Sequence, residues 1–167
     1  MAELHREARS GFGLVAIMAR KDLAAGAIGA ALGLEAPTRP GIAWANDGIA
    51  LIGTGQGTWL AYAEAPPPFW AEALRERLDG LASVSDQSDG YTITRLWGEG
   101  ARTVLQRGAA IDFHPQAFGP GSAATMVIAH IGAIVWQRDA RPTFEIATFR
   151  SYSDSFRHWL DQVAAAL

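Results

Sequence analysis

The order of apolar segments is the feature that most limits how this 167-residue chain can fold, because much the same succession occurs twice. In each half, a short apolar run typical of a strand precedes a helical segment, and further strands and a second helix follow. Such an order is typical of helices packed on antiparallel sheets. The sequence therefore predicts an α+β fold of two βαββαβ-like (ferredoxin-like) units in tandem.

The first half is expected to span about residues 11–81. Asp22 is expected to cap its first helix, and Gly33 to end it. The hairpin turn Asn46-Asp47-Gly48 is expected because Asp-Gly tolerates positive φ. The expected strands are 12–19, 42–45, 49–52 and 58–63. The second helix follows three prolines, and its expected apolar stripe is Phe69, Trp70, Ala73, Leu74 and Leu78.

The second half is expected to span about residues 82–167. Its expected strands are 91–97, 123–129, 131–136 and 144–148. One short helix is expected between Gly100 and Gly108. A last helix is expected from Ser151 or Ser153, with a buried face of Tyr152, Phe156, Trp159, Leu160 and Val163. Without a long linker the halves are expected to form a single domain, 1–167, with a polar, disordered segment at 1–10.

Composition excludes several classes of function. The net charge is −3, with 14 basic and 17 acidic residues, whereas nucleic-acid binding rests on a basic surface. The absence of cysteine excludes disulfides and thiolate chemistry. No apolar run reaches the ~20 residues of a membrane span, and none resembles a signal peptide. We therefore expect a cytoplasmic protein with neither nucleic-acid nor membrane partners.

Short motifs do not predict a catalytic, cofactor or metal site in this chain. The Gly-rich stretch 53–57 lacks the Gly-Lys-Ser/Thr ending of a phosphate loop and is interpreted as a hairpin loop. The four histidines lack the spacing of metal ligands. His114 follows Asp112 by two residues, and a carboxylate can orient an imidazole for acid–base work. Catalysis needs a constellation of groups, so a structural or interface role is favoured.

Several segments of the second half resemble the gamma subunit of heterotetrameric sarcosine oxidase. The most specific are Asp112-Phe113-His114-Pro115 and Arg150-Ser151-Tyr152 in combination. The others are 84–90, 96–98, 101–105, 108–111, 118–122, 143–146 and 158–160. The residues singled out as interface or motif candidates are Asp112, His114, Pro115, Arg150 and Trp159, and tryptophan is common at interfaces.

The resemblance implies a non-catalytic structural or docking subunit of a flavin-dependent complex. Such a complex oxidatively demethylates sarcosine to glycine, and tetrahydrofolate accepts the one-carbon unit. The implied partners are the alpha, beta and delta subunits, chiefly the flavin-bearing beta subunit. FAD, FMN, NAD, tetrahydrofolate and zinc belong to those partners, and none to this chain. The implied fold is similar to the folate-binding domain of the glycine-cleavage aminomethyltransferase.

Four alternatives stay open at this point. The chain could be a stand-alone folate-binding or one-carbon-transfer module, with Asp112 or Asp86 holding the ligand. It could be the gamma-type subunit of a related N-methylglutamate dehydrogenase. An independent hydrolase or isomerase would use His114 and Asp112. The isolated chain could also form a homodimer through an exposed docking surface.

Overall fold

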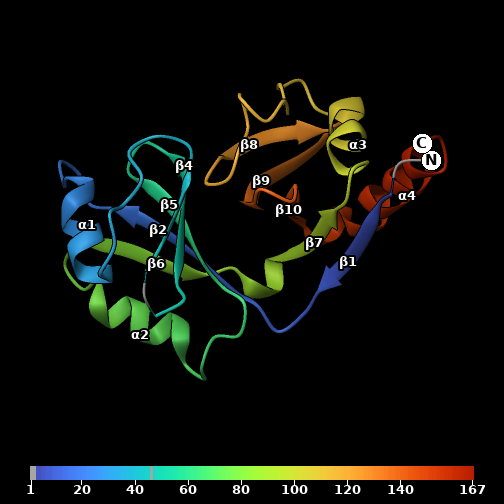
Figure 1. Ribbon diagram of the computed structural model, residues 1–167. Coiled ribbons are helices and arrows are strands. Elements are labelled where there is room, and N and C mark those ends of the chain that lie inside the picture. The colour runs from blue at the N-terminus through green and yellow to red at the C-terminus, as the bar shows by residue number, and fades with distance from the viewer. Residues whose placement is uncertain (1–2, 46) are drawn as a thin grey trace. The chain divides into compact units, whose positions relative to one another are not determined.

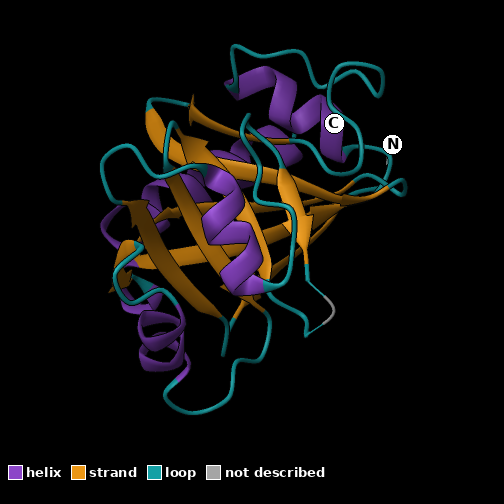
Figure 2. Cartoon of the chain, turned by 90° about the vertical axis from the view of Figure 1, so that its left-hand side faces the viewer, coloured by secondary structure: helices purple, strands orange, loops and turns teal. Residues whose placement is uncertain are grey.

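The computed structural model describes residues 3–45 and 47–167, which form two compact units (Figure 1). The first unit is Gly11–Asp89. The second unit combines the segment up to Ser10 with Gly90–Leu167. Figure 2 shows the helices and strands by type.

The first unit contains a five-stranded antiparallel sheet and two helices. Its strands lie in the order β3-β4-β5-β2-β6. In chain order its elements are β2 (Gly13–Ala19), α1 (Ala25–Leu32), β3 (Ile42–Trp44), β4 (Ala50–Gly55), β5 (Thr58–Ala63), α2 (Trp70–Arg77) and β6 (Ala82–Asp86).

The second unit also contains a five-stranded antiparallel sheet, in the order β1-β7-β10-β9-β8. Two helices pack on it, and short 3₁₀ turns precede β7 and α4. In chain order its elements are β1 (His5–Arg9), β7 (Tyr91–Trp97), α3 (Ala101–Gly108), β8 (Ala123–Ile128), β9 (Ile131–Asp139), β10 (Thr143–Phe149), η2 (Arg150–Tyr152) and α4 (Ser153–Ala164). The turn η1 (Ser88–Gly90) spans the boundary between the two units in the sequence.

The two sheets have the same topology once β1 is counted as the closing strand of the second. In the first unit, β2-α1-β4-β5-α2-β6 gives the sheet order β4-β5-β2-β6, and β3 adds an edge. In the second unit, the elements β7-α3-β9-β10-α4 give the sheet order β9-β10-β7. Strand β8 adds the edge beside β9, as β3 does beside β4. Strand β1 takes the position beside β7 that β6 takes beside β2. The α+β class and the repeated ferredoxin-like order are therefore confirmed.

We expected the segment 1–10 to be disordered; residues 1 and 2 lie outside the described residues, and most of the rest forms a strand. His5–Arg9 form β1 and pair antiparallel with β7, from His5 opposite Trp97 to Arg9 opposite Ile93 (Figure 1). An edge strand can be this polar, because charged side chains on an edge discourage pairing with other chains. High polarity in this segment is therefore compatible with an edge strand as well as with disorder.

The first unit ends at Asp89, a few residues after the division expected at about residue 81. Ala82–Asp86 form β6, which pairs with β2, and the first unit extends to Asp89. The residues of β6 are mostly small or polar and have weak strand preference, so sequence reasoning assigned Ser85 and Asp86 to a turn.

Each unit has its own apolar core between the helices and one face of its sheet. In the first unit, Ile28 of α1 and Leu74 of α2 pack with β-strand residues such as Val15. In the second, Val104 of α3 and Phe156 of α4 pack with residues such as Phe144. Burying a side chain of this size stabilises the fold by roughly 1.5–3 kcal/mol.

Three details of the predicted helices are wrong. Asp22 adopts a left-handed φ of 64°, which Asp tolerates better than most residues, and α1 begins after Ala24 instead. Phe69 precedes α2 in a left-handed conformation and is 79% exposed, and Ala73 is also exposed, so neither belongs to the buried stripe. Tyr152 is 50% exposed because it lies in the turn before α4.

Within the described residues, the helices are all too short or too polar to cross a membrane. The predicted turn at Asn46 lies outside the described residues, although β3 and β4, which flank it, pair as expected.

Candidate functional site

The loop between α3 and β8, which we call the motif loop, contains Asp112, His114 and Pro115. The Asp112 carboxylate accepts a hydrogen bond from the backbone N–H of His114 at 2.7 Å, which is an Asx turn. His114 Nδ1 in turn accepts from the backbone N–H of Gln116 at 3.3 Å. Both side chains are exposed. In the described residues, Asp112 and His114 thus bond to backbone groups of their own turn, and both side chains stabilise this turn.

Arg102 of α3 fastens this loop to the core of the second unit. Its guanidinium donates to the carbonyl oxygens of Phe113 and, at 2.9 Å, Phe118, and to Oε1 of Gln137 at 3.0 Å. It also lies 5.2 Å above the Phe144 ring, in cation–π geometry. The planar fork of arginine suits several acceptors at once. The hydrogen bonds of Arg102 thus hold the Ala101–Leu105 and Asp112–Pro115 motifs together.

Trp159 of α4 packs against the C-terminal end of α3. Its indole lies over Gly108, and its ring centroid is 5.6 Å from that of Phe156. It is partly buried and packs against the core of the second unit. The structure gives Trp159 a packing role at the base of the motif loop.

Arg150 does not join the motif loop but lines a hollow elsewhere in the second unit. Its Nη2 donates to the Tyr91 carbonyl of β7 at 3.0 Å. The hollow has a volume of about 480 Å³ and lies among β1, β7 and the start of α4. We call it the arginine groove, because its charged lining residues are Arg6, Arg9, Arg150, Arg157 and Glu7. Threonine, serine and apolar residues complete the lining.

Aromatic side chains flank Arg150 on both sides in the sequence. Phe149 and Tyr152 are 48% and 50% exposed. The Phe149 ring lies 4.7 Å from that of Tyr91, centroid to centroid. Burial raises the pKa of the Tyr91 phenol. Neighbouring residues of a strand point to opposite faces of a sheet, so the Tyr91 and Phe149 rings lie on the face opposite to Thr92 and Thr94, which line the arginine groove.

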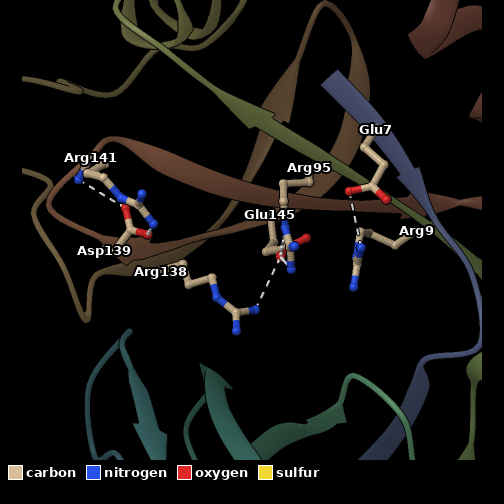
Figure 3. Close-up of polar contacts among 7 residues, drawn as sticks. All are labelled: Glu7, Arg9, Arg95, Arg138, Asp139, Arg141 and Glu145. Carbon is tan, nitrogen blue, oxygen red and sulfur yellow. Dashed lines mark hydrogen bonds and ion pairs between the residues drawn. The ribbon is translucent and has the colours of Figure 1, made fainter. Parts of the chain in front are cut away.

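A row of charges crosses the strands of the second unit (Figure 3). Strand register places Glu7 of β1, Arg95 of β7 and Glu145 of β10 side by side. Arg95 Nε donates to Glu145 Oε1 at 2.7 Å, and Arg138 Nη1 lies 3.7 Å from the same oxygen. Arg9 pairs with Glu7 at 3.1 Å. Opposite charges alternate along this row.

Glu145 is completely buried. Burial raises the pKa of its carboxyl, and the hydrogen bond and charge of Arg95 and the charges of Arg138 and Arg9 oppose this without cancelling it. Its Oε2 atom has no hydrogen-bond partner among the described residues. The row is therefore a polar inclusion in an otherwise apolar sheet, and its ionisation affects stability.

Sequence reasoning missed this row and the groove. The signal for the row was a charge inside an apolar strand, Phe144-Glu145-Ile146, and another inside Thr94-Arg95-Leu96. The groove had no such signal, since its arginines come from β1, η2 and α4. Among the described residues there is no group of three or more His, Cys, Asp or Glu that could hold a metal ion.

Comparison with known proteins shows which family has this arrangement. The sequence model described as "Sarcosine oxidase, gamma subunit family" matches residues 18–166. The chain belongs to this family. The gamma subunit family was predicted from the motif loop and the Arg-Ser-Tyr segment, and that prediction is confirmed. No curated protein matches this family member in sequence.

Solved structures agree with the membership in the gamma subunit family. The chain is 25% identical to a chain of the heterotetrameric sarcosine oxidase from Corynebacterium sp. U-96 in complex with pyrrole 2-carboxylate. The match has a TM-score of 0.86 and covers 98% of this chain and 84% of that one. It also resembles aminomethyltransferase T of the glycine cleavage system from Bartonella henselae, at 15% identity and a TM-score of 0.69, covering 95% of this chain and 45% of that one. The predicted likeness to the aminomethyltransferase fold is confirmed.

Proposed function

We propose that this gamma-family chain is a non-catalytic structural subunit that docks with the other subunits of a flavin-dependent sarcosine oxidase in the cytoplasm. The observation that carries the proposal is the match, over 98% of the chain, to a chain of a heterotetrameric sarcosine oxidase. A fold alone does not determine function, but family membership and a matching assembly point in the same direction.

The roles of the motif residues support a structural function. Asp112 and His114 bond to backbone groups of their own turn, and Arg102 fastens that turn to the core. Residues that are distinctive in sequence therefore shape a surface loop. Arg150 lies beside exposed aromatic side chains, and arginine and aromatic residues are enriched at protein–protein interfaces.

In the proposed complex, chemistry takes place in the partner subunits. Alpha, beta and delta partners would hold FAD, FMN, NAD, tetrahydrofolate and zinc, and the flavin-bearing beta subunit would be the chief contact. The complex would oxidise the methyl group of sarcosine and pass the one-carbon unit to tetrahydrofolate. This chain would hold the partners in their active arrangement.

Co-expression tests the proposal. The tagged chain should co-purify with the alpha, beta and delta subunits of the same host, and the eluate should show flavin absorbance and turn over sarcosine. Complexes assembled without this chain should be less stable or less active. A colourless eluate containing the single chain, repeated at low ionic strength, would contradict the proposal.

Assays of the purified complex and of the isolated chain also distinguish the N-methylglutamate dehydrogenase and the folate-binding alternatives. Turnover of N-methylglutamate in place of sarcosine would identify the related dehydrogenase. Titration calorimetry of the isolated chain with tetrahydrofolate should give no heat at high micromolar concentration. Saturable heat would instead support a folate-binding module.

A further inference from the structure

Phe69 has a strained backbone and an exposed side chain. Its φ is 59°, and it is 79% exposed, more than any other large hydrophobic residue that the structure describes. A left-handed conformation is an outlier for a bulky residue and persists only when the surrounding structure imposes it. In the first unit, therefore, burial of the phenyl ring does not offset the strain of this conformation.

The other left-handed residues among the described ones, glycines aside, have local explanations. They are Asp22, Ala129 and His130. Aspartate tolerates this conformation better than most residues. Ala129 and His130 form the two-residue turn between β8 and β9, and positive φ at both positions of such a turn matches the twist of the strands. The conformation of Phe69 has neither explanation.

The sequence around Phe69 would fold with less strain if another residue stood at this position. Phe69 follows Pro68, and a proline followed by a left-handed residue is the pattern of a type II turn, in which the second residue is ordinarily glycine or asparagine. Phe69 is also the N-cap of α2 and makes no capping hydrogen bond, whereas Ser, Thr, Asp and Asn are preferred there. Two local preferences thus oppose phenylalanine, and proteins keep such residues mainly at functional sites.

The loop that carries Phe69 is fastened at its base and projects from the first unit. Pro66 and Trp70 pack over Gly13 of β2, where a Cβ atom would lie 2.9 Å from Cγ of the proline and 2.6 Å from the indole. The two exposed residues at 67–68 are prolines, whose rings fix φ. Figure 1 shows the loop between β5 and α2 extending beyond the sheet of its unit. The ring is therefore presented on a stiff support and loses little conformational entropy on binding.

The chemistry of this loop indicates what it fits. Residues 65–69 read Ala-Pro-Pro-Pro-Phe and carry no charge. A charged surface pressed against them would lose water without gaining a polar partner, so an apolar pocket suits the ring. Three hollows of the described chain are lined in part by charged residues, among them Arg20 in the first unit and Arg6 and Arg95 in the second. A partner of different sequence therefore fits the ring better than a second copy of this chain.

We propose that Phe69 is an anchor that inserts into an apolar pocket on another subunit of the proposed oxidase complex. The inference rests on the proposed function, since it names a docking contact of that same subunit. Burial of the ring in the pocket offsets the strained backbone and the missing cap, which lower the stability of the isolated chain. Aromatic side chains that fill a partner's pocket are typical anchors of protein–protein interfaces.

The first test compares the stability of the chain with its capture of partners. Phe69→Gly removes the ring and suits the left-handed conformation. The matched control Asp22→Gly makes the same replacement at an exposed left-handed residue that has no aromatic ring. The denaturation midpoint of each isolated chain is measured, and each tagged chain is co-expressed with the alpha, beta and delta subunits. We expect Phe69→Gly to raise the midpoint and to lower capture at least tenfold, and Asp22→Gly to keep capture within twofold of wild type.

The outcomes distinguish the inference from the proposed function. Loss of capture in Phe69→Gly alone, with a midpoint no lower than that of wild type, supports the inference. Capture equal to that of wild type overturns it and leaves the proposed function intact. A lowered midpoint would show that the ring supports the fold of this chain, and loss of capture in both variants would show an unspecific effect; either result also overturns the anchor. Failure of wild type to capture any subunit overturns the proposed function itself.

A second test identifies the pocket. The photoreactive residue p-benzoylphenylalanine takes the place of Phe69, the assembled complex is irradiated, and mass spectrometry identifies the linked peptides. We expect links to apolar residues of one partner subunit. Links to a second copy of this chain would overturn the assignment to a partner, and an assembled complex without links would overturn the contact.

Discussion

The indole of Trp159 covers Gly108 so closely that a Cβ atom at residue 108 would overlap the ring. The same Cβ would lie 2.9 Å from Cγ2 of Ile128. Gly108 is the last residue of α3, and α4 can approach α3 here only because this position lacks a side chain.

The variant Gly108→Ala should therefore be destabilised by about 1–3 kcal/mol, because overpacking forces side chains out of place. The control is Gly26→Ala in α1, where a Cβ would meet nothing within 4 Å. There alanine should be neutral or stabilising by up to about 1 kcal/mol. Chemical denaturation measures both; a loss of similar size in the two variants would contradict the packing explanation.

Replacing Arg102 should loosen the motif loop. Arg102→Lys cannot serve Phe113, Phe118 and Gln137 together, and leaving buried acceptors unsatisfied costs about 1–3 kcal/mol each. We expect lower stability and faster amide hydrogen exchange over residues 111–121. Arg107→Lys on the same helix is the control, since Arg107 is exposed and binds C-terminal carbonyls. Unchanged exchange in the Arg102 variant would refute the role of this side chain.

The buried carboxyl of Glu145 should make stability depend on pH. Because its pKa is raised in the folded state, protonation favours folding, and that contribution is complete at low pH. It is lost as the pH rises from the ordinary glutamate value through the raised value. Denaturation of wild type and Glu145→Gln across this range should show the wild type losing stability relative to the variant. A constant difference, or one that grows in favour of wild type, would show the assigned direction to be wrong.

The motif loop should matter for structure and not for catalysis. Asp112→Ala removes the acceptor of the Asx turn and should cost about 0.5–2 kcal/mol, by analogy with other side-chain caps. His114→Ala should leave sarcosine turnover of the assembled complex unchanged. Steady-state kinetics and thermal unfolding of the two variants check this pair of expectations. Loss of turnover with intact assembly in His114→Ala would favour the hydrolase or isomerase alternative.

The sequence predicted the bounds of strands, helix ends and turns correctly where a segment's own residues determine its conformation. Thr58–Ala63 and Tyr91–Trp97 have their predicted bounds, because apolar and β-branched residues are bounded there by turns. Gly33 ends α1 in the left-handed conformation. His130 lies in the β8–β9 turn with φ of 67°, as its place between two apolar runs indicated.

Features that depend on distant partners were not predictable. The strands β1 and β6 are polar edges, and only their pairing with β7 and β2 reveals them. The contact between Arg95 and Glu145 requires the register of two strands about 50 residues apart. The candidate Arg150 lines a hollow that is formed in part by residues of β1, so its surroundings depend on a strand more than 140 residues away in the sequence.

The position of β1 has a consequence for protein synthesis. This strand leaves the ribosome more than 80 residues ahead of β7, the strand it pairs with. The intervening residues form the first unit, which can fold while the closing strand of the other sheet is still waiting. Until β7 emerges, β1 has no partner strand, and its charges discourage pairing with strands of other nascent chains. The charges of His5–Arg9 therefore protect a folding intermediate as well as the finished sheet.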